Sequence, residues 1–411
     1  MIVGTYVIWF SRYNIPNHLM LGTIFVAYLV PLFLTDVLSE FQQELVTQYA
    51  YILTIGAVFY VIGLVFGHRY VLLHRMIKRP PMFSVTLEVF MQQRYRFLVW
   101  VTIFALFAMI LSWMYIGTVP MFAEDPFSAK FFKGEYYEAY SRVAIPYRLS
   151  QMAQITLFPI LVALWFLTRR KLLLVLVVTI MVFFAMALTR ALVFSGIFTL
   201  IALYATRKKR YIFGFIFLHV FVISVGSAIY YLIGLLFGSD AFGVINAAGA
   251  DIWTVTAAGS PDIFDQLSLL QAFDDHGTYT LGRTFFGGLV PGQFYWNPSA
   301  WSLYLANNTD DITDVSSGGF RIPVAMWGYF SFGWFGVVML PALSGLVLGA
   351  STRYIQGFIS NKNILTSVLA LSFYTVILAF FWNFHLMSMY AIPAGGLLIA
   401  VLYKFAWSAK R

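Results

Sequence analysis

The stretch KLLLVLVVTIMVFFAMALTRALVFSGIFTLIALYATRKKR, residues 171–210, decides the fold. It begins and ends with basic residues, and a single charged residue, Arg190, lies between those ends. The apolar runs on either side of Arg190, 172–188 and 191–205, are too continuous for helices on the surface of a soluble domain. The stretch therefore predicts two membrane-embedded helices joined by a short turn that carries an arginine.

The whole chain has the composition of a polytopic membrane protein. Of its 411 residues, 61% are apolar and 10% are charged, whereas soluble domains carry about 25% charged residues. Cysteine is absent, which excludes disulfides and cysteine-ligated metals. We expect an all-α integral membrane protein with about 10–11 transmembrane helices, and residues 1–10 are too short to span. The predicted spans lie near 19–35, 49–67, 97–117, 152–168, 172–188, 191–205, 212–237, 323–350, 364–383 and 386–406.

Two polar segments interrupt the apolar runs. The smaller segment is 118–148, and the larger, 239–322, is too polar for lipid and too long for a turn. We expect both to be loops on one side of a single transmembrane domain that comprises residues 1–411.

Charge predicts the orientation of the bundle through the positive-inside rule. One set of alternate loops holds 19 of the 26 Lys and Arg residues but only one acid, Glu88, and the other side holds 7 basic residues and 16 acids. The basic set comprises Arg12, 68–96, 169–171, 207–210, 353–362 and the C-terminal tail. We therefore expect both termini in the cytoplasm and 239–322 outside. The pI of about 9.5 then reflects topology and contact with anionic lipid, not binding of nucleic acid.

Arg190 follows a run that is shorter than a full crossing, so we expect its turn to lie below the outer membrane surface. A buried arginine at such a depth costs about 2.5–3.5 kcal/mol on insertion scales. Its side chain either extends outward and caps helix carbonyls, or lines a water-filled cavity and binds an anion. Phosphate suits the second interpretation because a planar guanidinium donates two hydrogen bonds at once.

The large outer segment is acidic, with nine acids against two basic residues, Arg283 and Arg321. The pattern predicts a short amphipathic helix over 263–273 and irregular structure from Gly282 to Pro298. Glycines precede Arg321 and Pro323 follows it, as at the start of a helix. The arginines are therefore the informative charges of this segment.

Two outer histidines are candidate proton acceptors near neutral pH: His276 in the large segment and His385 at the outer end of a predicted span. A lone histidine is more often a structural hydrogen-bonding residue than a proton acceptor. The acidic pairs at 274–275 and 310–311 could chelate a hard cation, but such pairs are common in outer loops. We expect no metal and no cofactor.

Four motifs together resemble the Wzy family of O-antigen and oligosaccharide repeat-unit polymerases. TRAL at 189–192 is similar to the Thr-Arg turn of these enzymes. SPDIFDQLSLLQAF at 260–273 and GRTFFGGLVPGQF at 282–294 resemble their acidic segment followed by an arginine and a proline-rich stretch. SSGGFRIPVAMWGYFSFGWFG at 316–336 resembles their glycine-rich loop exit. The many helices and the one large late loop also match.

The resemblance implies a GT-C-like fold and a membrane glycosyltransferase of the bacterial inner membrane with its active site facing the periplasm. Such an enzyme joins undecaprenyl-diphosphate-linked oligosaccharides into a surface polysaccharide such as O-antigen or capsule, without a nucleotide sugar. Its partners are the lipid-linked donor and acceptor, membrane lipids, a chain-length regulator and a flippase. The resemblance makes Arg190, Arg283 and Arg321 candidates for binding the diphosphate, and Asp265 a third candidate base.

Two other functions stay open. An O-antigen ligase-type transferase would use the same donor with another acceptor. A flippase for lipid-linked oligosaccharides, or another transporter, would need charges spread along several helices and repeated halves. The chain shows no internal repeat, and its predicted spans are nearly free of charge except at their outer ends.

Overall fold

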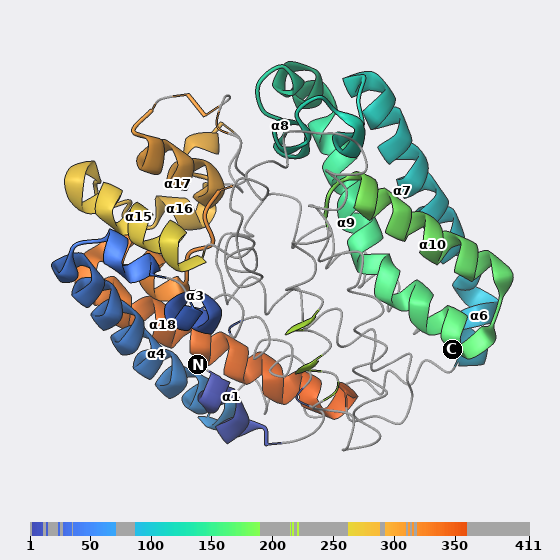
Figure 1. The fold of residues 1–411 in the computed structure, drawn as a ribbon. Helices are drawn as coiled ribbons and strands as arrows, with labels where there is room; N and C mark the ends of the chain where they lie inside the picture. Colours follow the sequence, from blue (N-terminus) through green and yellow to red (C-terminus); the bar gives the residue numbers. More distant parts are fainter. Residues whose placement is uncertain are drawn as a thin grey trace.

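The computed structural model describes residues 2–10, 14, 24, 28–34, 36–70, 87–189, 214, 216–217, 220–221, 262–287, 292–309, 311–312, 315 and 319–359. These residues are mostly helical and include no strand (Figure 1). Four segments are long and apolar enough to cross a membrane: Gln43–Tyr70, Tyr95–Phe122, Tyr136–Thr168 and Val324–Arg353. The expectation of an all-α protein with membrane-spanning helices is confirmed to this extent.

These four segments coincide with predicted spans 49–67, 97–117, 152–168 and 323–350, and a shorter apolar helix, α10 (Lys171–Met186), coincides with 172–188. The other predicted spans lie wholly or largely outside the described residues. The total number of crossings therefore stays a prediction.

The helices form two groups, which lie on the left and right of Figure 1. The first group contains α1 (Ile2–Ile8), α3 (Val30–Leu34), α4 (Gln43–Tyr70), α15 (Asp262–His276), α16 (Arg283–Phe286), α17 (Pro298–Asn307) and α18 (Val324–Ile359). The second contains α6 (Leu87–Gln93), α7 (Tyr95–Ile116), α8 (Pro126–Phe131), α9 (Tyr136–Thr168) and α10. The predicted amphipathic helix over 263–273 is confirmed by α15.

Close backbone contact joins α4 to α18. Five glycines lie in this interface, and a Cβ atom on any of them would overlap an atom of the other helix. Lipid tails are as apolar as the side chains, so hydrophobicity does not drive helices together in a membrane. They associate through close packing, which small residues permit. The residues are Gly56, Gly63, Gly67, Gly345 and Gly349.

The helix predicted over 323–350 is not continuous, which corrects the sequence-based expectation. Phe332 (φ −141°, ψ 18°) and Gly333 (φ 60°, ψ −146°) have non-helical backbone angles, and those of Gly333 fall in a region that residues with a Cβ atom avoid. Gly328 and Gly336, on opposite sides of the break, approach so closely that a Cβ atom on either would overlap the other's carbonyl. The chain therefore folds back on itself at the break.

The break in α18 exposes two carbonyl groups that a continuous helix would use internally. The N–H of Thr280 donates to the carbonyl oxygen of Phe330 at 2.9 Å, and the N–H of Leu281 donates to that of Ser331 at 3.2 Å. Both carbonyls are thereby satisfied, as buried backbone groups must be. The turn after α15 is thus fastened to the outer end of α18.

Helix α9 begins at Tyr136, well before the predicted start of its span at residue 152. Much of the predicted outer loop 118–148 is therefore helical. With 33 residues, α9 is about 50 Å long, which exceeds a hydrocarbon core of about 30 Å. It is therefore longer than one crossing requires.

Hydrogen bonds between polar side chains and α7 fix α9 within the second group. Ser150 donates to the carbonyl oxygen of Ala105 at 2.6 Å, and the Gln154 amide lies 3.1 Å from the sulfur of Met109. The opposite face of α7 exposes large apolar side chains, among them Trp100 and Phe104. Polar contacts between the two helices and apolar side chains on the outside suit a lipid environment.

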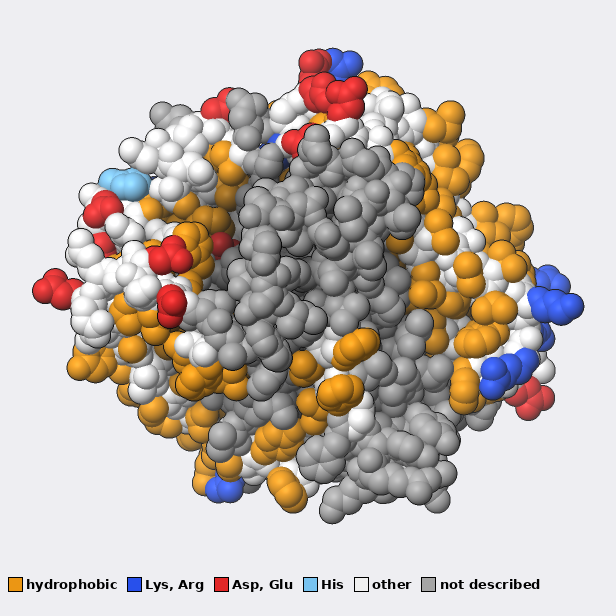
Figure 2. Space-filling model, in the orientation of Figure 1, with side chains coloured by type: hydrophobic (Ala, Val, Ile, Leu, Met, Phe, Trp, Pro, Cys, Tyr) orange, Lys and Arg blue, Asp and Glu red, His pale blue; other side chains and the backbone are white. Residues whose placement is uncertain are grey.

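Charged side chains separate along the described helices. Figure 2 shows Asp and Glu mainly near α8 and α15, and Lys and Arg mainly at the opposite ends of the helices, with hydrophobic side chains between them. This distribution agrees with the charge asymmetry of the sequence.

We predict that residue 275 faces outside and that residues 208 and 408 face the cytoplasm, because the basic loops stay inside. The chain has no natural cysteine, so Asp275→Cys, Lys208→Cys and Ser408→Cys each introduce a single thiol. In intact cells an impermeant thiol reagent should label only the first variant. Labelling of Lys208→Cys together with protection of Asp275→Cys would reverse the orientation.

Candidate functional site

Helix α10 ends abruptly just before the Thr-Arg turn. The N–H groups of Leu188 and Thr189 donate to the carbonyl oxygens of Ala185 and Phe184, both at 2.9 Å, in the pattern of a Schellman motif. Leu188 adopts φ 54°, a left-handed conformation that costs a non-glycine residue about 1–2 kcal/mol. Burial of its side chain offsets this cost.

The ended helix is short for a crossing. Its 16 residues rise about 24 Å, less than the hydrocarbon thickness of about 30 Å. The start of α10 lies level with the start of α7, because the Arg170 guanidinium is 4.8 Å from the ring centre of Tyr95. The chain therefore leaves α10 about 24 Å from this common level, and the depth of the turn in a membrane stays a prediction. Arg190 itself lies outside the described residues.

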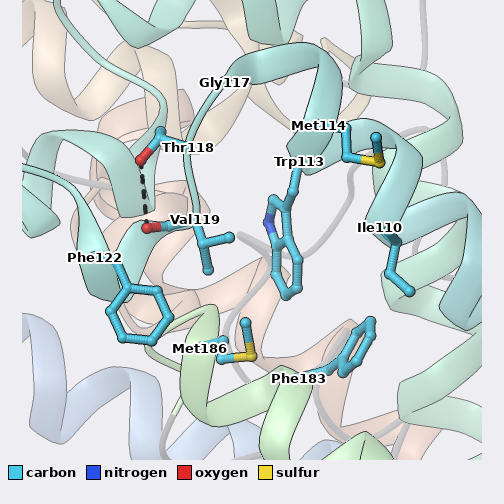
Figure 3. Close-up of a pocket in the computed structure, with 9 residues that line it drawn as sticks. All are labelled: Ile110, Trp113, Met114, Gly117, Thr118, Val119, Phe122, Phe183 and Met186. Carbon is cyan, nitrogen blue, oxygen red and sulfur yellow. Dashed lines mark hydrogen bonds between the residues drawn. The ribbon is translucent and has the colours of Figure 1, made fainter.

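An apolar pocket of about 730 Å³ lies where the ends of α7 and α10 meet (Figure 3). Its volume falls within the usual range for small-molecule sites. Met114 and Phe122 line it and are 72% and 59% exposed on the outside of the group. The pocket is therefore an open hollow whose apolar side chains are accessible from outside the group. The lining residues are Ile110, Trp113, Met114, Gly117, Thr118, Val119, Phe122, Phe183 and Met186.

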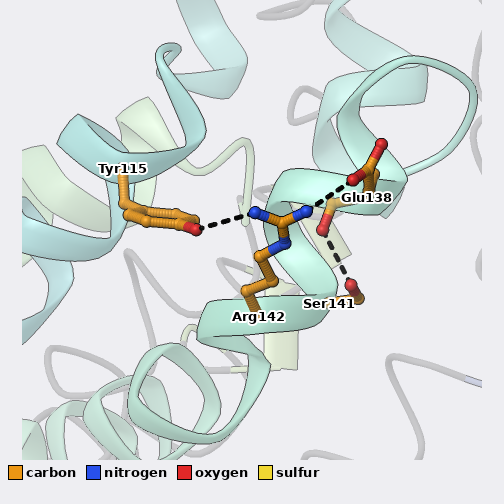
Figure 4. A network of polar contacts seen from close by, with 4 residues as sticks. All are labelled: Tyr115, Glu138, Ser141 and Arg142. Carbon is orange, nitrogen blue, oxygen red and sulfur yellow. Dashed lines mark hydrogen bonds and ion pairs between the residues drawn. The ribbon is translucent and has the colours of Figure 1, made fainter.

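A polar contact joins α7 to α9 beside this pocket (Figure 4). Arg142 donates to a carboxylate oxygen of Glu138 at 2.6 Å and lies 3.5 Å from the hydroxyl of Tyr115. Both charged side chains are highly exposed, so water screens their attraction and the pair adds little to stability. The pair lies at the same end of α7 as the pocket.

Arg148 is a more enclosed cation in the same region. Its Nε atom donates to the hydroxyl of Tyr140 at 2.6 Å, and its guanidinium lies 5.9 Å from the ring centre of Phe132. Phe132 packs in one cluster with Trp113 of the pocket and with Ala187 at the end of α10. A half-buried guanidinium thus lies one layer of aromatic rings from the apolar pocket and from the turn that precedes Arg190.

The residues predicted in the large outer segment lie on α15, α16 and the start of α18. Gln266 of α15 is fully buried and fully bonded: it accepts from Tyr49 at 2.7 Å, and donates to Tyr28 and to the Arg321 carbonyl oxygen, both at 2.9 Å. These bonds tie the backbone of Arg321 to the helix that carries Asp265. Asp265 is half-buried and Arg321 is exposed.

Arg283 lies on another part of this segment, at the start of α16. Its side chain is exposed, and its guanidinium is 5.0 Å from the ring centre of Trp296. It is therefore placed beside aromatic side chains.

The candidate bases differ in their surroundings. The Nε2 atom of His276 is 2.9 Å from the carbonyl oxygen of Leu305. A carbonyl only accepts, so this nitrogen carries the hydrogen and leaves Nδ1 as the proton acceptor. Asp274 was considered only as a cation ligand, yet partial burial raises the pKa of its carboxyl and the neighbouring Asp275 raises it further, while a Gln48 hydrogen bond opposes the shift. His385 lies outside the described residues.

A direct contact joins the two helix groups at their outer ends. The Nζ atom of Lys133 donates to the carbonyl oxygen of Ile312 at 2.7 Å. Partial burial lowers the pKa of the Lys133 ammonium, and the nearby charge of Asp311 opposes this shift. The contact connects the segment that carries Arg148 to the one that carries Arg283 and Arg321.

Two residues of this region, Arg148 and Gln266, are not among the predicted site residues, although Gln266 lies within the stretch SPDIFDQLSLLQAF. Gln266 does carry a signal, because it occupies a helical position on the face of α15 that buries Ile263, Leu267 and Leu270. Arg148 begins a run of polar positions on α9 that a loop assignment conceals.

In comparisons with known proteins, no protein-family model, curated protein or solved structure matches this chain.

Proposed function

We propose that the protein is a membrane glycosyltransferase of the GT-C type, and that it polymerises lipid-diphosphate-linked oligosaccharide repeat units at the outer face of a bacterial inner membrane. Its substrates are an undecaprenyl-diphosphate-linked chain and a second lipid-linked repeat unit. The observation that carries the proposal is the apolar pocket at the outer end of α7 and α10. A half-buried arginine, Arg148, lies close to it, and the turn with Arg190 follows directly in the sequence.

This arrangement suits an amphiphilic substrate with a diphosphate at headgroup depth. An isoprenoid chain is apolar and would reach the pocket from the bilayer, and the exposed apolar side chains of Met114 and Phe122 suit such a chain. A diphosphate at the end of that chain requires cations at the level where α10 stops. Arginine meets this requirement because it stays charged and donates paired hydrogen bonds to phosphate oxygens.

The proposed reaction replaces the bond between the anomeric carbon of the growing chain and the diphosphate oxygen with a bond to a sugar hydroxyl. A hydroxyl of the incoming repeat unit attacks that carbon, and the bond to the diphosphate oxygen breaks. Negative charge gathers on the leaving lipid diphosphate, where Arg190, Arg283 and Arg321 are the proposed stabilising groups. The hydroxyl proton passes to a base, for which Asp265, His276 and His385 are the candidates. Asp274 is a further candidate because the pKa of its carboxyl is raised.

The purified protein should elongate lipid-linked repeat units extracted from the strain that carries it, with no nucleotide sugar and with a chelator present. The donor already contains the activated glycosyl bond, and arginines replace a metal in stabilising the leaving group. Product length on a gel, scored as a ladder of added repeats, is the measurement.

Other outcomes of the same assay would assign another function. Transfer of a single chain to a lipid A core acceptor, without a ladder, would indicate a ligase. Movement of the lipid-linked substrate across a liposome membrane, without polymer, would indicate a transporter. Loss of activity in chelator, restored by a divalent ion, would contradict the metal-free mechanism.

A further inference from the structure

The outer segment carries a group of aromatic side chains, Phe294, Tyr295, Trp296 and Tyr304, that the proposed chemistry does not use. Phe294 and Tyr295 are 59% and 46% exposed. The ring of Tyr295 stacks on that of Tyr304, with centroids 4.8 Å apart, and meets that of Trp296 edge to face at 5.0 Å. These four residues are called the aromatic platform below.

The platform is held on short, rigid elements. Phe294–Trp296 form a helical turn, and Gly287, which follows α16, lies so close to Trp296 that a Cβ atom would overlap the backbone of the latter. On the other side, Asn297 accepts a hydrogen bond from the N–H of Ser299 at 3.0 Å and so begins α17. The backbone that carries the exposed rings is therefore held by local contacts before any ligand binds, which lowers the entropic cost of binding.

A hydrogen-bonding group lies on the platform. The guanidinium of Arg283 is 5.0 Å from the ring centre of Trp296. This guanidinium makes no hydrogen bond with any residue that the structure describes. Arginine has five N–H donors, so donors remain for a ligand at the edge of the aromatic surface.

We propose that the aromatic platform and Arg283 form a binding site for an oligosaccharide chain. A sugar ring has a face of C–H bonds, which stacks on an aromatic ring, and an edge of hydroxyl groups, which accept hydrogen bonds from a guanidinium. This inference rests on the proposed function, which supplies the oligosaccharide. It assigns Arg283 to the glycan part of the substrate in place of the diphosphate, which Arg190 and Arg321 then bind.

The charge of the segment argues against an anionic membrane surface as the occupant. Residues 239–322 contain nine acids and two basic residues, whereas segments that bind such surfaces are basic. Exposed aromatic rings on an acidic segment instead suit a ligand whose recognition depends on stacking and hydrogen bonds.

Binding can be measured without any transfer reaction. The probe is the lipid-free oligosaccharide released by mild acid from the lipid-linked repeat units of the strain, together with its polymer. The full-length protein in lipid nanodiscs should bind both, and Phe294→Ala and Tyr295→Ala should each raise the Kd about tenfold or more. Trp296→Phe, which preserves an aromatic ring beside Gly287, should weaken binding less.

Two variants are matched controls. Leu281→Ala removes an exposed apolar side chain from the same segment, and Tyr137→Ala removes an exposed tyrosine from the other outer segment. Both should bind like the wild type. Failure of the wild type to bind either probe, or equal binding by Tyr295→Ala, would overturn the site.

The membrane alternative has its own readout. Phe294→Cys gives the cysteine-free chain one thiol for a fluorophore, and nitroxide-labelled lipid headgroups should leave its emission unchanged. Quenching would place the platform in the membrane interface and overturn the proposal. A protein that binds glycan through Tyr295 but forms no polymer would overturn only the polymerase function. If polymer forms but glycan binding is the same with and without Tyr295, only the platform is overturned.

Discussion

Arg190→Lys should reduce polymer formation about 100-fold while the amount of protein in the membrane stays near normal. Lysine keeps the charge but loses the planar pair of donors that a phosphate group accepts. Arg190→Ala removes the charge as well, and its loss should approach 1,000-fold, the upper range for one group that stabilises a developing anion. Polymer length on a gel, normalised to protein level, measures both.

Lys130→Ala is the matched control, because Lys130 is a cation of the same outer side whose ammonium lies over Phe131. It should leave polymer length unchanged. Lys133 is unsuitable, since its bond to Ile312 joins the two helix groups. Normal polymer from Arg190→Ala would refute the diphosphate role. If the amount of polymer falls only in proportion to the protein level, Arg190 is needed for folding and not for binding the diphosphate.

Gly63→Val should have the largest effect on stability. A Cβ atom at this position would overlap the carbonyl group of Ala342, so the backbones of α4 and α18 have to separate along their shared length. Overpacking of a tight interface costs about 1–3 kcal/mol and occasionally more, and backbone has less freedom to yield than a side chain. We expect a cost of about 3 kcal/mol, measured as a fall in Tm and as loss of monodisperse protein in detergent.

Ile62→Val tests whether this effect belongs to the interface. Ile62 precedes Gly63 but is 54% exposed on the outward face of α4, so loss of one methylene there should leave Tm close to that of the wild type. An unchanged Tm for Gly63→Val would mean that α4 and α18 do not pack through this glycine.

Hydrophobicity alone predicted a helix correctly where a whole segment is apolar, because its side chains face either lipid or other helices. The coincidence of α7 with 97–117 and of α10 with 172–188 illustrates this. It failed at α9, whose first turns are stabilised by aromatic packing such as that of Phe132 on Tyr140. It failed again at Gly333, because a broken helix and a continuous one have the same hydropathy.

The candidate site was predictable to a smaller extent. A charge in an apolar run is visible in any sequence, and Arg190 was identified in this way. Gln266 was not, because its role depends on partners such as Tyr49 and Arg321 that are distant in the chain. The proximity of Arg148 to the pocket likewise depends on how α7, α9 and α10 meet, which no local pattern specifies.

The break in α18 has a consequence for biosynthesis. Its carbonyl groups at Phe330 and Ser331 are satisfied by the N–H groups of Thr280 and Leu281, which leave the ribosome earlier. In the proposed orientation these donors have already been exported when α18 reaches the translocon. Inside the translocon the segment has no such partners, so a straight helix that bonds its own carbonyls is the form that enters the bilayer. We expect the fold-back to arise only after release, when the exported turn docks on the emerging helix.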